Sequence, residues 1–250
     1  MNALPAPLWL SPQDPPHLFP PTHHALTEPD GLLAIGGSLS PERLAHAYRH
    51  GIFPWDFWQQ QPLWWAPRLR FVLPGQALHL PRRLHRKLRH VSWLMTTDTC
   101  FQAVIAACAQ PRSGQHGTWL TPQMQAAYLE LHHQGLAHSV EIWDEGRLIG
   151  GLYGVHMGRV FSGESMFHRI PDASKAAVAA TVALMGLQGI LDCQVASPHM
   201  KALGGQLMER DMFEQVLLEP ARPWGLPTPL SGLSGQSVAL RDVLSCANIS

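Results

Sequence analysis

The sequence has few cysteines, few charges and no long unbroken apolar run. Its four cysteines lie far apart and form no CxxC pair, so a zinc clasp or dithiol redox chemistry has no support and we expect buried, reduced thiols. Charged residues make up 14% of the chain and hydrophobic residues 46%, which excludes a disordered protein. The 250 residues suffice for one large domain, or for a small domain beside a larger one.

Signals for export or membrane insertion are also absent from the sequence. The first cation is Arg43, so the positively charged start that is typical of a secretory signal peptide is missing. The longest apolar stretch, residues 176–191, is interrupted by polar residues and glycines. We therefore expect a cytoplasmic protein that has no membrane partner.

One long stretch of the chain contains no acidic residue. Lys plus Arg and Asp plus Glu number 18 each, so the net charge of +0 gives no bulk attraction to nucleic acid. Between Asp56 and Asp98, however, every charged residue is a cation, which leaves two alternatives: a phosphate backbone binds here, or the segment is a solvated basic helix face. These cations are Arg68, Arg70, Arg82, Arg83, Arg86, Lys87 and Arg89.

The N-terminal third of the chain is rich in proline and tryptophan. Eight prolines in residues 1–30 predict an extended arm that lies over the surface. Ser40 as N-cap, Pro41 at the first helical position and Gly51 as the stop predict a short helix. Residues 51–70 crowd four tryptophans among prolines, which we interpret as a loop-like stretch.

The rest of the chain predicts helices that feed a mostly antiparallel sheet, an α+β fold. From Ser139 onward, short apolar runs alternate with turn residues, which is typical of a strand meander. The tail after Pro223 has little helix or strand signal. The expected elements are helices over 98–109, 121–135 and 174–188, strands over 139–143, 147–156, 160–167 and 191–195, and a helical segment through Leu203 and Leu207.

A series of short motifs follows one after another over most of residues 28–204. They are EPDGLLAIGG (28–37), AYRHGIFPW (47–55), LWWAP (63–67), GTWL (117–120), AHSVEIW (137–143), GGLYGV (150–155), FSGESMF (161–167), ASK (173–175) and DCQ (192–194). Any one of them would be weak evidence, but the series in this order and spacing is specific. It resembles the leucyl/phenylalanyl-tRNA-protein transferase family.

The resemblance implies both a fold and an activity. The implied fold is a small N-terminal domain over residues 1–70, with the proline-rich arm, and a catalytic domain of the acyl-CoA N-acyltransferase type (GNAT-like) over residues 71–250. The implied activity moves leucine or phenylalanine, with methionine as a further candidate, from aminoacyl-tRNA to the α-amino group of proteins that begin with Arg or Lys, which marks them for degradation. The partners would be Leu-tRNA, Phe-tRNA and these acceptor proteins, and no cofactor or metal is expected.

Such a reaction needs orientation and the removal of one proton. The ester of an aminoacyl-tRNA is already activated, and holding two reactants in line can contribute about 7–11 kcal/mol. An α-amino group has a pKa of about 7.7–8.0, so a carboxylate or a polar relay suffices to deprotonate it. No covalent intermediate is required.

Three polar residues could handle the amine. Asp192 and Gln194 alternate along the predicted strand 191–195 and should project to the same face, and Glu164 follows a glycine in another strand. By resemblance, Asp192, Gln194 and Glu164 correspond to the catalytic and substrate-orienting residues of the family. Asp192 could draw off the proton, directly or through Gln194, or it could only orient Gln194. The alternative is structural: a helix cap at Asp192 and an ion pair at Glu164.

The resemblance also assigns candidate binding residues for the donor. An apolar pocket for the leucine or phenylalanine side chain would be lined by Leu152, Phe161, Met166 and Leu191, for which core packing is the competing explanation. The terminal adenosine would stack, at about 1–3 kcal/mol per base, on Trp55 and Trp119. Phosphates of the tRNA would be bound by Arg82, Arg83, Arg86 and Lys87.

Other chemistries find less support in the sequence. The His23–His24 and His132–His133 pairs have no third metal ligand at a recognisable spacing, and no serine lies in a GxSxG motif. An acetyl-CoA-dependent N-acetyltransferase usually has a [QR]-x-x-G-x-[GA] turn, whereas the nearest match, residues 147–152, ends in leucine. A non-catalytic tRNA-binding module would leave the FSGESMF and DCQ motifs without a purpose.

Overall fold

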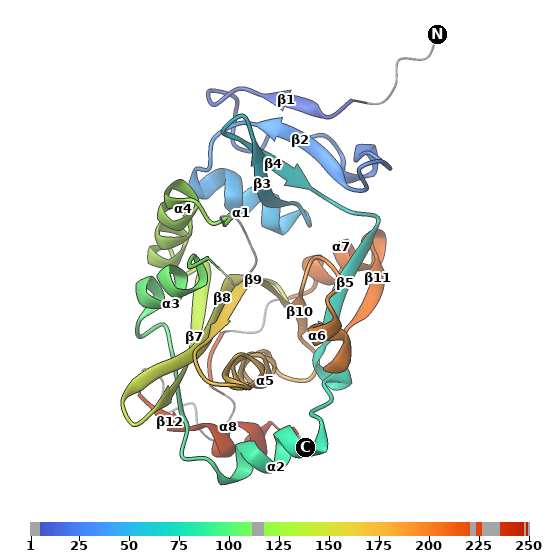
Figure 1. The fold of residues 1–250 in the computed structure, drawn as a ribbon. Helices are drawn as coiled ribbons and strands as arrows, with labels where there is room; N and C mark the ends of the chain where they lie inside the picture. The colour runs from blue at the N-terminus through green and yellow to red at the C-terminus, as the bar shows by residue number, and fades with distance from the viewer. Residues whose placement is uncertain (1–5, 112–117, 221–223, 227–235, 248, 250) are drawn as a thin grey trace.

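A computed structural model describes residues 6–111, 118–220, 224–226, 236–247 and 249. Within these ranges the chain forms a four-stranded sheet and a larger, eight-stranded sheet (Figure 1). The smaller sheet has the strand order β1-β2-β4-β3. Its strands are β1 (Leu8–Leu10), β2 (Leu32–Gly36), β3 (Phe53–Trp58) and β4 (Gln61–Trp65). No helix of the described ranges is long and apolar enough to cross a membrane.

The larger sheet has the strand order β11-β5-β10-β9-β8-β7-β6-β12 and is antiparallel except where β10 runs parallel to β9. The predicted meander is confirmed in β7, β8 and β9. The strands are β5 (Leu69–Pro74), β6 (Leu94–Thr97), β7 (Ala137–Asp144), β8 (Arg147–Met157), β9 (Val160–His168), β10 (Ile190–Asp192), β11 (Gln206–Glu209) and β12 (Val238–Ala239).

Helices cover both faces of the larger sheet. On one face, α5 packs against apolar side chains such as Val140, Leu152 and Leu191. On the other face, α3 and α4 share a core with α1, with the small sheet and with Tyr153. The helices are α1 (Pro41–Arg49), α2 (Arg82–His90), α3 (Phe101–Cys108), α4 (Pro122–His133), α5 (Ala173–Met185), α6 (Pro198–Ala202), α7 (Arg210–Leu218) and α8 (Leu240–Cys246), with 3-10 turns η1 (Thr22–His24) and η2 (Gly75–Ala77). The fold is therefore the expected mixture of α and β structure.

The helix starts follow the predicted chemistry. The hydroxyl of Ser40 accepts a hydrogen bond from the backbone N–H of Arg43, and Thr121 caps α4 in the same way. A proline occupies the first turn of both helices, where its missing N–H costs nothing. Four predicted helices, α1, α3, α4 and α5, are thus confirmed, with ends that differ by a few residues.

Most of residues 51–70 form a β-hairpin of β3 and β4, so the prediction of a loop was wrong. Gln59 and Gln60 connect β3 to β4 with φ angles of 48° and 64°. Two positive φ values mark the tight hairpin turn that Asn and Gly normally supply. Since glutamine carries no such signal, the hairpin could not be recognised locally. The crowded tryptophans partly make a core: Trp64 is fully buried and donates its indole N–H to the carbonyl of Gly36 at 2.7 Å.

The proline-rich arm is tied to this small sheet. Its strand β1 pairs in parallel with β2, and the rest of its described residues is extended apart from turns. The fully buried guanidinium of Arg43 donates to the carbonyl oxygens of Asp14 (2.7 Å) and Leu18 (3.3 Å). An arginine fork that satisfies buried carbonyl groups therefore holds the arm against α1.

Three further predictions about the C-terminal half were wrong. The strand expected over 191–195 ends at Asp192, because Gln194 has a φ of 55° and leaves the extended conformation. Leu207 lies in strand β11 rather than in a helix, since it pairs with Phe71 of β5. The tail contains α8 and the edge strand β12, although its sequence has little periodic signal.

A β-bulge in β9 determines how the larger sheet presents its side chains. Tyr153 pairs with Ser165 and Gly154 pairs with Gly163, so Glu164 is an extra residue without a partner on β8. A bulge re-aims the side chain of the extra residue and shifts the alternation of the strand. Phe161 and Met166, five positions apart, consequently pack on the same core, whereas a regular strand would place them on opposite faces.

The bulge depends on Gly154, and we predict that Gly154→Ala disrupts it. A methyl group at this position would overlap the backbone carbonyl of Ser162 and the ring of Phe161, and backbone atoms cannot move aside. We expect a loss in the free energy of unfolding above the roughly 1–3 kcal/mol of ordinary overpacking, with shifted amide signals around Glu164. Urea unfolding and amide NMR spectra test this.

Gly135→Ala is the control for that prediction. Gly135 has a φ of 70°, but no atom of the described residues lies within 4 Å of an added methyl group. The substitution should therefore lower the free energy of unfolding only by the backbone strain, about 1–2 kcal/mol. Equal losses in the free energy of unfolding of the two variants would contradict the role of Gly154 in the bulge.

Candidate active site

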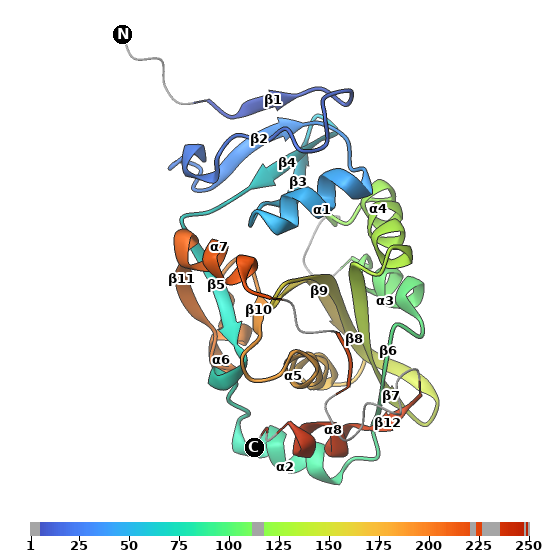
Figure 2. The same cartoon turned by 180° about the vertical axis from the view of Figure 1, so that it is seen from behind.

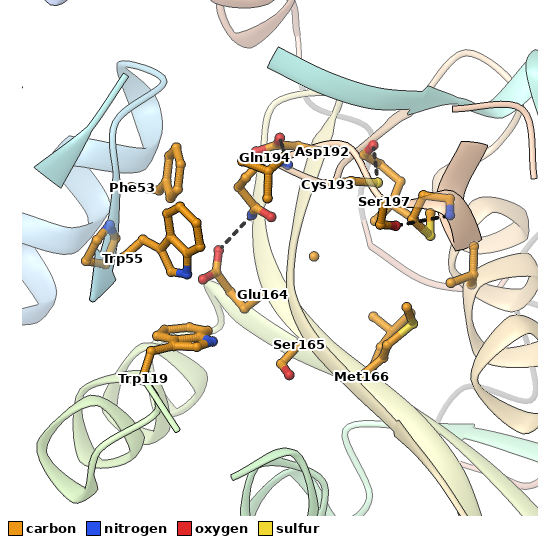
Figure 3. A pocket seen from close by; sticks show the side chains of 17 residues that line it. Phe53, Trp55, Trp119, Glu164, Ser165, Met166, Asp192, Cys193, Gln194 and Ser197 are labelled. Atoms are coloured by element: carbon orange, nitrogen blue, oxygen red, sulfur yellow. Dashed lines mark hydrogen bonds between the residues drawn. The ribbon is translucent and has the colours of Figure 1, made fainter. Parts of the chain in front are cut away.

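A cavity opens between the small sheet and the strands β9 and β10 (Figure 3). It holds about 220 Å³, less than the roughly 300–1,000 Å³ of pockets for drug-sized ligands, so it suits a group of the size of one amino acid. The residues that line it are Phe53, Pro54, Trp55, Trp119, Leu152, Gly163, Glu164, Ser165, Met166, Val178, Leu191, Asp192, Cys193, Gln194, Val195, Ser197 and Met200.

A buried ion pair forms one wall of this cavity. The Nε and Nη2 atoms of Arg70 donate to the two carboxylate oxygens of Asp192, each at 2.8 Å, and both side chains are almost fully buried. The third nitrogen of Arg70, Nη1, donates to the carbonyl of Gly51 at 2.9 Å, and the guanidinium lies between the rings of Phe53 and Phe213. Arg70 thus spans β5, the small sheet and α7.

The carboxylate of Asp192 also fixes the backbone beyond β10. Its Oδ1 accepts the backbone N–H of Gln194 at 2.9 Å, and its Oδ2 accepts the hydroxyl of Ser162 at 3.1 Å. Gln194 adopts its positive φ directly at this contact. Asp192 and Gln194 are in contact, as expected. The contact joins the carboxylate of Asp192 to the backbone amide of Gln194, and the two side chains are not neighbours on one strand face.

Glu164 and Gln194 meet inside the cavity. The side-chain Nε2 of Gln194 donates to Oε1 of Glu164 at 3.2 Å, and the hydroxyl of Tyr128 donates to Oε2 at 2.7 Å (Figure 3 draws the first bond). The hydroxyl of Tyr48 lies 2.8 Å from that of Tyr128. Helices α1 and α4 therefore hold this carboxyl group from the side opposite Gln194.

The pKa of Glu164 is raised to about 7. Burial of the carboxyl is the main cause, and the nearby charge of Asp192 adds to it. Hydrogen bonding by Tyr128 and Tyr48 and the charge of Arg70 act in the opposite direction. A carboxyl group that titrates near neutral pH can exchange a proton with a bound amine at physiological pH.

The apolar end of the cavity contains three of the four predicted pocket residues. Leu152, Met166 and Leu191 line the cavity. Phe161 does not line it: its ring is fully buried and stacks on that of Trp224, with centroids 4.7 Å apart. Phe161 of β9 pairs directly with Leu191 of β10 and packs on the same core, but Trp224 covers its ring, a contact that the position in the strand could not reveal.

The two predicted tryptophans line the same cavity. Trp55 comes from β3, and Trp119 precedes α4. In Figure 3 both rings lie on one side of Glu164, and Met166 lies on the other. Trp55 is 39% exposed, so it is available to an incoming planar group. Along the cavity, the aromatic rings come first, the carboxyl group of Glu164 and the amide of Gln194 follow, and the apolar side chains come last.

The basic helix α2 lies outside the cavity. Arg82, Arg83 and Arg86 are exposed on it. Lys87 is engaged instead, since its Nζ donates to the carbonyl of Pro171 at 2.8 Å and to the carboxylate of Asp172 at 3.1 Å. The cations between Asp56 and Asp98 therefore lie in two environments. Arg82, Arg83 and Arg86 face solvent, whereas Arg70 lies in the core.

Several site residues were not identified from the sequence. Arg70 was grouped with the surface cations, and its burial has no local signal. Tyr48 and Tyr128 lie on the buried faces of their helices, and a tyrosine at such a position needs a polar partner, which is a signal that could have found them. Cys193 lines the cavity, but burial raises the pKa of its thiol far above the usual range, so it is not a nucleophile.

The histidine pairs form no metal site with their surroundings. Among the residues whose placement is described, no group of three or more His, Cys, Asp or Glu side chains is arranged to hold a metal ion. The Nδ1 of His132 instead donates a hydrogen bond to the carbonyl of Ala137, and the ring stacks on Phe101.

Removing the Tyr128 hydroxyl should raise the pKa of Glu164 above about 7, because this hydrogen bond favours the charged carboxylate. We expect Tyr128→Phe to move the titration of Glu164 upward in carbon-13 NMR spectra of glutamate-labelled protein. Tyr153→Phe serves as the control, since the buried hydroxyl of Tyr153 has no hydrogen-bond partner among the described residues. An unchanged titration in Tyr128→Phe would show that this bond does not stabilise the carboxylate.

Comparison with known proteins places the chain in a family. Residues 72–218 match the model of the leucyl/phenylalanyl-tRNA protein transferase family, and residues 37–68 match the model of its N-terminal domain. A relative from Xanthomonas campestris pv. campestris (strain 8004) is 52% identical over 220 residues, which are 84% of this chain and 88% of the relative. It is named leucyl/phenylalanyl-tRNA–protein transferase.

Two more distant bacteria have relatives of the same name. The one from Methylococcus capsulatus is 50% identical over 212 residues, 84% of this chain and 90% of its own length. The one from Saccharophagus degradans is 48% identical over 216 residues, 86% and 88% of the two chains. Since the two family models together cover every residue that lines the cavity, and these relatives are about half identical over most of the chain, the chain belongs to the leucyl/phenylalanyl-tRNA protein transferase family.

Proposed function

We propose that this chain transfers leucine or phenylalanine from aminoacyl-tRNA to the α-amino group of proteins that begin with Arg or Lys, marking them for degradation. The relatives carry the name of this reaction. The observation that carries the proposal is the order of groups in the cavity: two tryptophans, then Glu164 with Gln194, then an apolar end. An aminoacyl-adenosine has the matching order of base, reacting ester and apolar side chain.

Each part of the donor has a surface of suitable chemistry. A flat adenine can stack on Trp55 and Trp119. The amino acid side chain fits the end lined by Leu152, Met166 and Leu191, where the unbranched methionine adapts to leucine or phenylalanine. The ester then lies beside Glu164 and Gln194, where the acceptor amine has to arrive.

We propose different roles for the two carboxyl groups. Both oxygens of Asp192 are occupied by Arg70, Ser162 and the backbone of Gln194, so Asp192 acts as a positioning residue for Gln194. Glu164 has a pKa of about 7 and accepts the proton of the amine while Gln194 orients it. The amine nitrogen then forms a bond to the ester carbonyl carbon, the bond to the ribose oxygen of the tRNA breaks, and the proton held by Glu164 passes to that oxygen, which leaves as the ribose hydroxyl.

We further propose that residues 1–70 and 71–250 form two domains, the second of the acyl-CoA N-acyltransferase type. The match to the model of the N-terminal domain ends at residue 68, and the match to the other family model begins at residue 72. This supports a division near residue 70. The single parallel pair, β9 with β10, borders the cavity of an otherwise antiparallel sheet, which supports a GNAT-like arrangement.

A direct assay tests the reaction. Purified protein is incubated with radiolabelled Phe-tRNA or Leu-tRNA and a peptide that begins with Arg, and a peptide that begins with Asp is the control. A parallel sample contains labelled acetyl-CoA. Label transferred from either tRNA to the Arg peptide is the expected result, whereas label that appears only from acetyl-CoA would contradict the proposal.

Glu164→Gln should lower the single-turnover rate at neutral pH by the ~10²–10⁴-fold that a lost general base costs. The wild-type rate should rise with pH through about 7, since the carboxylate form of Glu164 accumulates above its pKa. The remaining rate of the variant should follow the amine itself, which titrates at about 7.7–8.0. Rates with saturating Phe-tRNA across pH distinguish these cases.

Asp192→Asn is the companion variant. It leaves the buried guanidinium of Arg70 without its charge partner, and breaking a buried pair typically costs about 3–5 kcal/mol of stability. We expect a lower melting temperature and, per folded molecule, a smaller loss of rate than in Glu164→Gln. If the folded Asp192→Asn enzyme loses more of its single-turnover rate than Glu164→Gln, and the Glu164→Gln enzyme stays active, then Asp192 is the base.

Trp119→Ala should weaken the binding of the aminoacyl-adenosine end by about 1–3 kcal/mol, the contribution of one stacked base. Puromycin, which combines a modified adenosine with an aromatic amino acid, should inhibit this variant less than the wild type. Met208→Ala provides a comparison outside the cavity, since Met208 lies in β11. Equal inhibition of all three proteins would assign Trp119 to packing.

A further inference from the structure

One face of the small sheet presents tryptophan side chains to solvent. Figures 1 and 2 show this sheet at one end of the molecule, with α1 between it and the larger sheet. The buried Trp64 belongs to the core that α1 shares with the sheet. Its neighbours on β4, Leu63 and Trp65, therefore point to the opposite face, because successive residues of a strand alternate. Both of these side chains are partly exposed.

The strand register adds Trp9 and Trp58 to the same face. Ile35 of β2 pairs with both Trp9 and Leu63, and directly paired residues share a face. Trp58 pairs with Gln61, which alternates with Leu63 along β4. The rings of Trp9 and Trp58 meet edge to face with centroids 5.7 Å apart, and the two residues are 57% and 47% exposed. We call Trp9, Trp58, Leu63 and Trp65 the tryptophan face.

The tryptophan face is continuous with the cavity. Trp65 pairs with Phe53, which lines the cavity. The indole N–H of Trp65 donates to the backbone carbonyl of Trp55 at 2.7 Å, and the ring centroids of these two tryptophans are 6.0 Å apart. Since Trp55 also lines the cavity, a chain that leaves the cavity past β3 comes directly onto the tryptophan face.

The charges around this face have one sign. From residue 6 to residue 67, and outside α1, every Asp, Glu, Lys or Arg residue is acidic: Asp14, Glu28, Asp30 and Asp56. Asp56 lies in the irregular part of β3, Asp30 precedes β2, and both are exposed. An acidic rim repels a phosphate backbone and attracts a cationic polypeptide. Tryptophan rings favour the same ligand, because their faces attract ammonium and guanidinium groups.

We propose that the tryptophan face binds the acceptor polypeptide beyond its first residue, as an extended segment with apolar and basic side chains. This inference rests on the proposed function, in which the amine of the acceptor reacts at Glu164. From Phe53 to Trp58, β3 covers at most about 16 Å, at about 3.3 Å per residue. An extended acceptor covers that distance with about five residues. Its residues from about the fourth to the seventh therefore contact the tryptophan face.

The test compares two acceptors that share their first three residues. One is the tripeptide Arg-Gly-Gly, which spans about 10 Å and ends before Trp58. The other is a ten-residue peptide that continues with Leu, Phe and Lys. We expect the double variant Trp9→Ala/Trp58→Ala to raise KM and Kd for the long peptide about tenfold, because aromatic side chains carry much of the energy of a binding surface. The kcat/KM for the tripeptide and the melting temperature should stay the same, since both rings are exposed.

Leu207→Ala is the matched control. Leu207 is 57% exposed, as Trp9 is, but it lies on β11 of the larger sheet. This variant should change KM for neither peptide. An unchanged KM and Kd for the long peptide in the Trp9→Ala/Trp58→Ala variant would overturn the proposal, and so would losses of equal size with the two peptides at an unchanged melting temperature.

The charge of the rim gives a second test that leaves the rings in place, and it decides if the tryptophan variant does not fold. Asp56→Asn keeps a side-chain oxygen for the backbone N–H of Phe57, and asparagine tolerates the φ of 68°. Asp30→Asn keeps an oxygen for the N–H of Arg68. At low salt the double variant Asp30→Asn/Asp56→Asn should raise Kd for the long peptide by about two- to fivefold. A version of the peptide with Gln in place of Lys should bind both proteins equally, and an equal loss with the Lys and Gln peptides would contradict the proposal.

Direct binding separates this inference from the reaction. The Kd is measured without tRNA by fluorescence anisotropy of the long peptide, labelled at its C-terminus. A wild-type protein that transfers to neither peptide refutes the proposed function, while this Kd still decides whether the tryptophan face binds a polypeptide. Weaker tRNA binding in the tryptophan variant, with unaltered peptide binding, would assign the face to RNA. A wild-type dimer that the tryptophan variant dissociates, again with unaltered peptide binding, would assign it to a second copy of the chain, and either result overturns the proposal.

Discussion

The buried ion pair between Arg70 and Asp192 is the interaction on which the site depends. Arg70 lies in β5, which pairs with β10, and its remaining nitrogen reaches the backbone at Gly51, in the turn between α1 and β3 of the small sheet. Removing two charges from water is costly and is compensated only when each hydrogen-bonding group finds a partner. Here the guanidinium lies against the phenyl rings of Phe53 and Phe213, and the carboxylate accepts hydrogen bonds from Ser162 and from a backbone amide. One residue pair thereby fixes the small sheet, α7 and the cavity relative to one another.

The position of the reactive groups follows from this pair and from the bulge in β9. Asp192 ends its strand by accepting the N–H of Gln194, which turns the amide toward Glu164. The bulge makes Glu164 the unpaired residue of β9, so that its side chain is free to meet Tyr128 as well. A carboxyl group between an amide and a phenol, out of bulk water, titrates near 7. Backbone irregularities on two neighbouring strands thus bring the amide of Gln194 and the carboxyl group of Glu164 together.

The cavity and the helix α2 place their polar groups in different environments. Aromatic and apolar walls surround Glu164, and the exclusion of water there strengthens each polar contact. Arg82, Arg83 and Arg86 are exposed on α2, where salt screens their charge.

The amino-acid sequence by itself determined the helices with clear caps at Ser40 and Thr121, the strand meander, the family and eight of the 17 residues that line the cavity. Period and capping are local, and motifs carry family information. Tertiary structure alone decided that Arg70 is buried while Arg82 is exposed, that Gln59–Gln60 makes a turn, and that Phe161 packs on Trp224. These features arise from partners far away in the chain: Asp192 is 122 residues from Arg70. No local pattern encodes the environment of a charge, because burial and pairing exist only once distant strands meet.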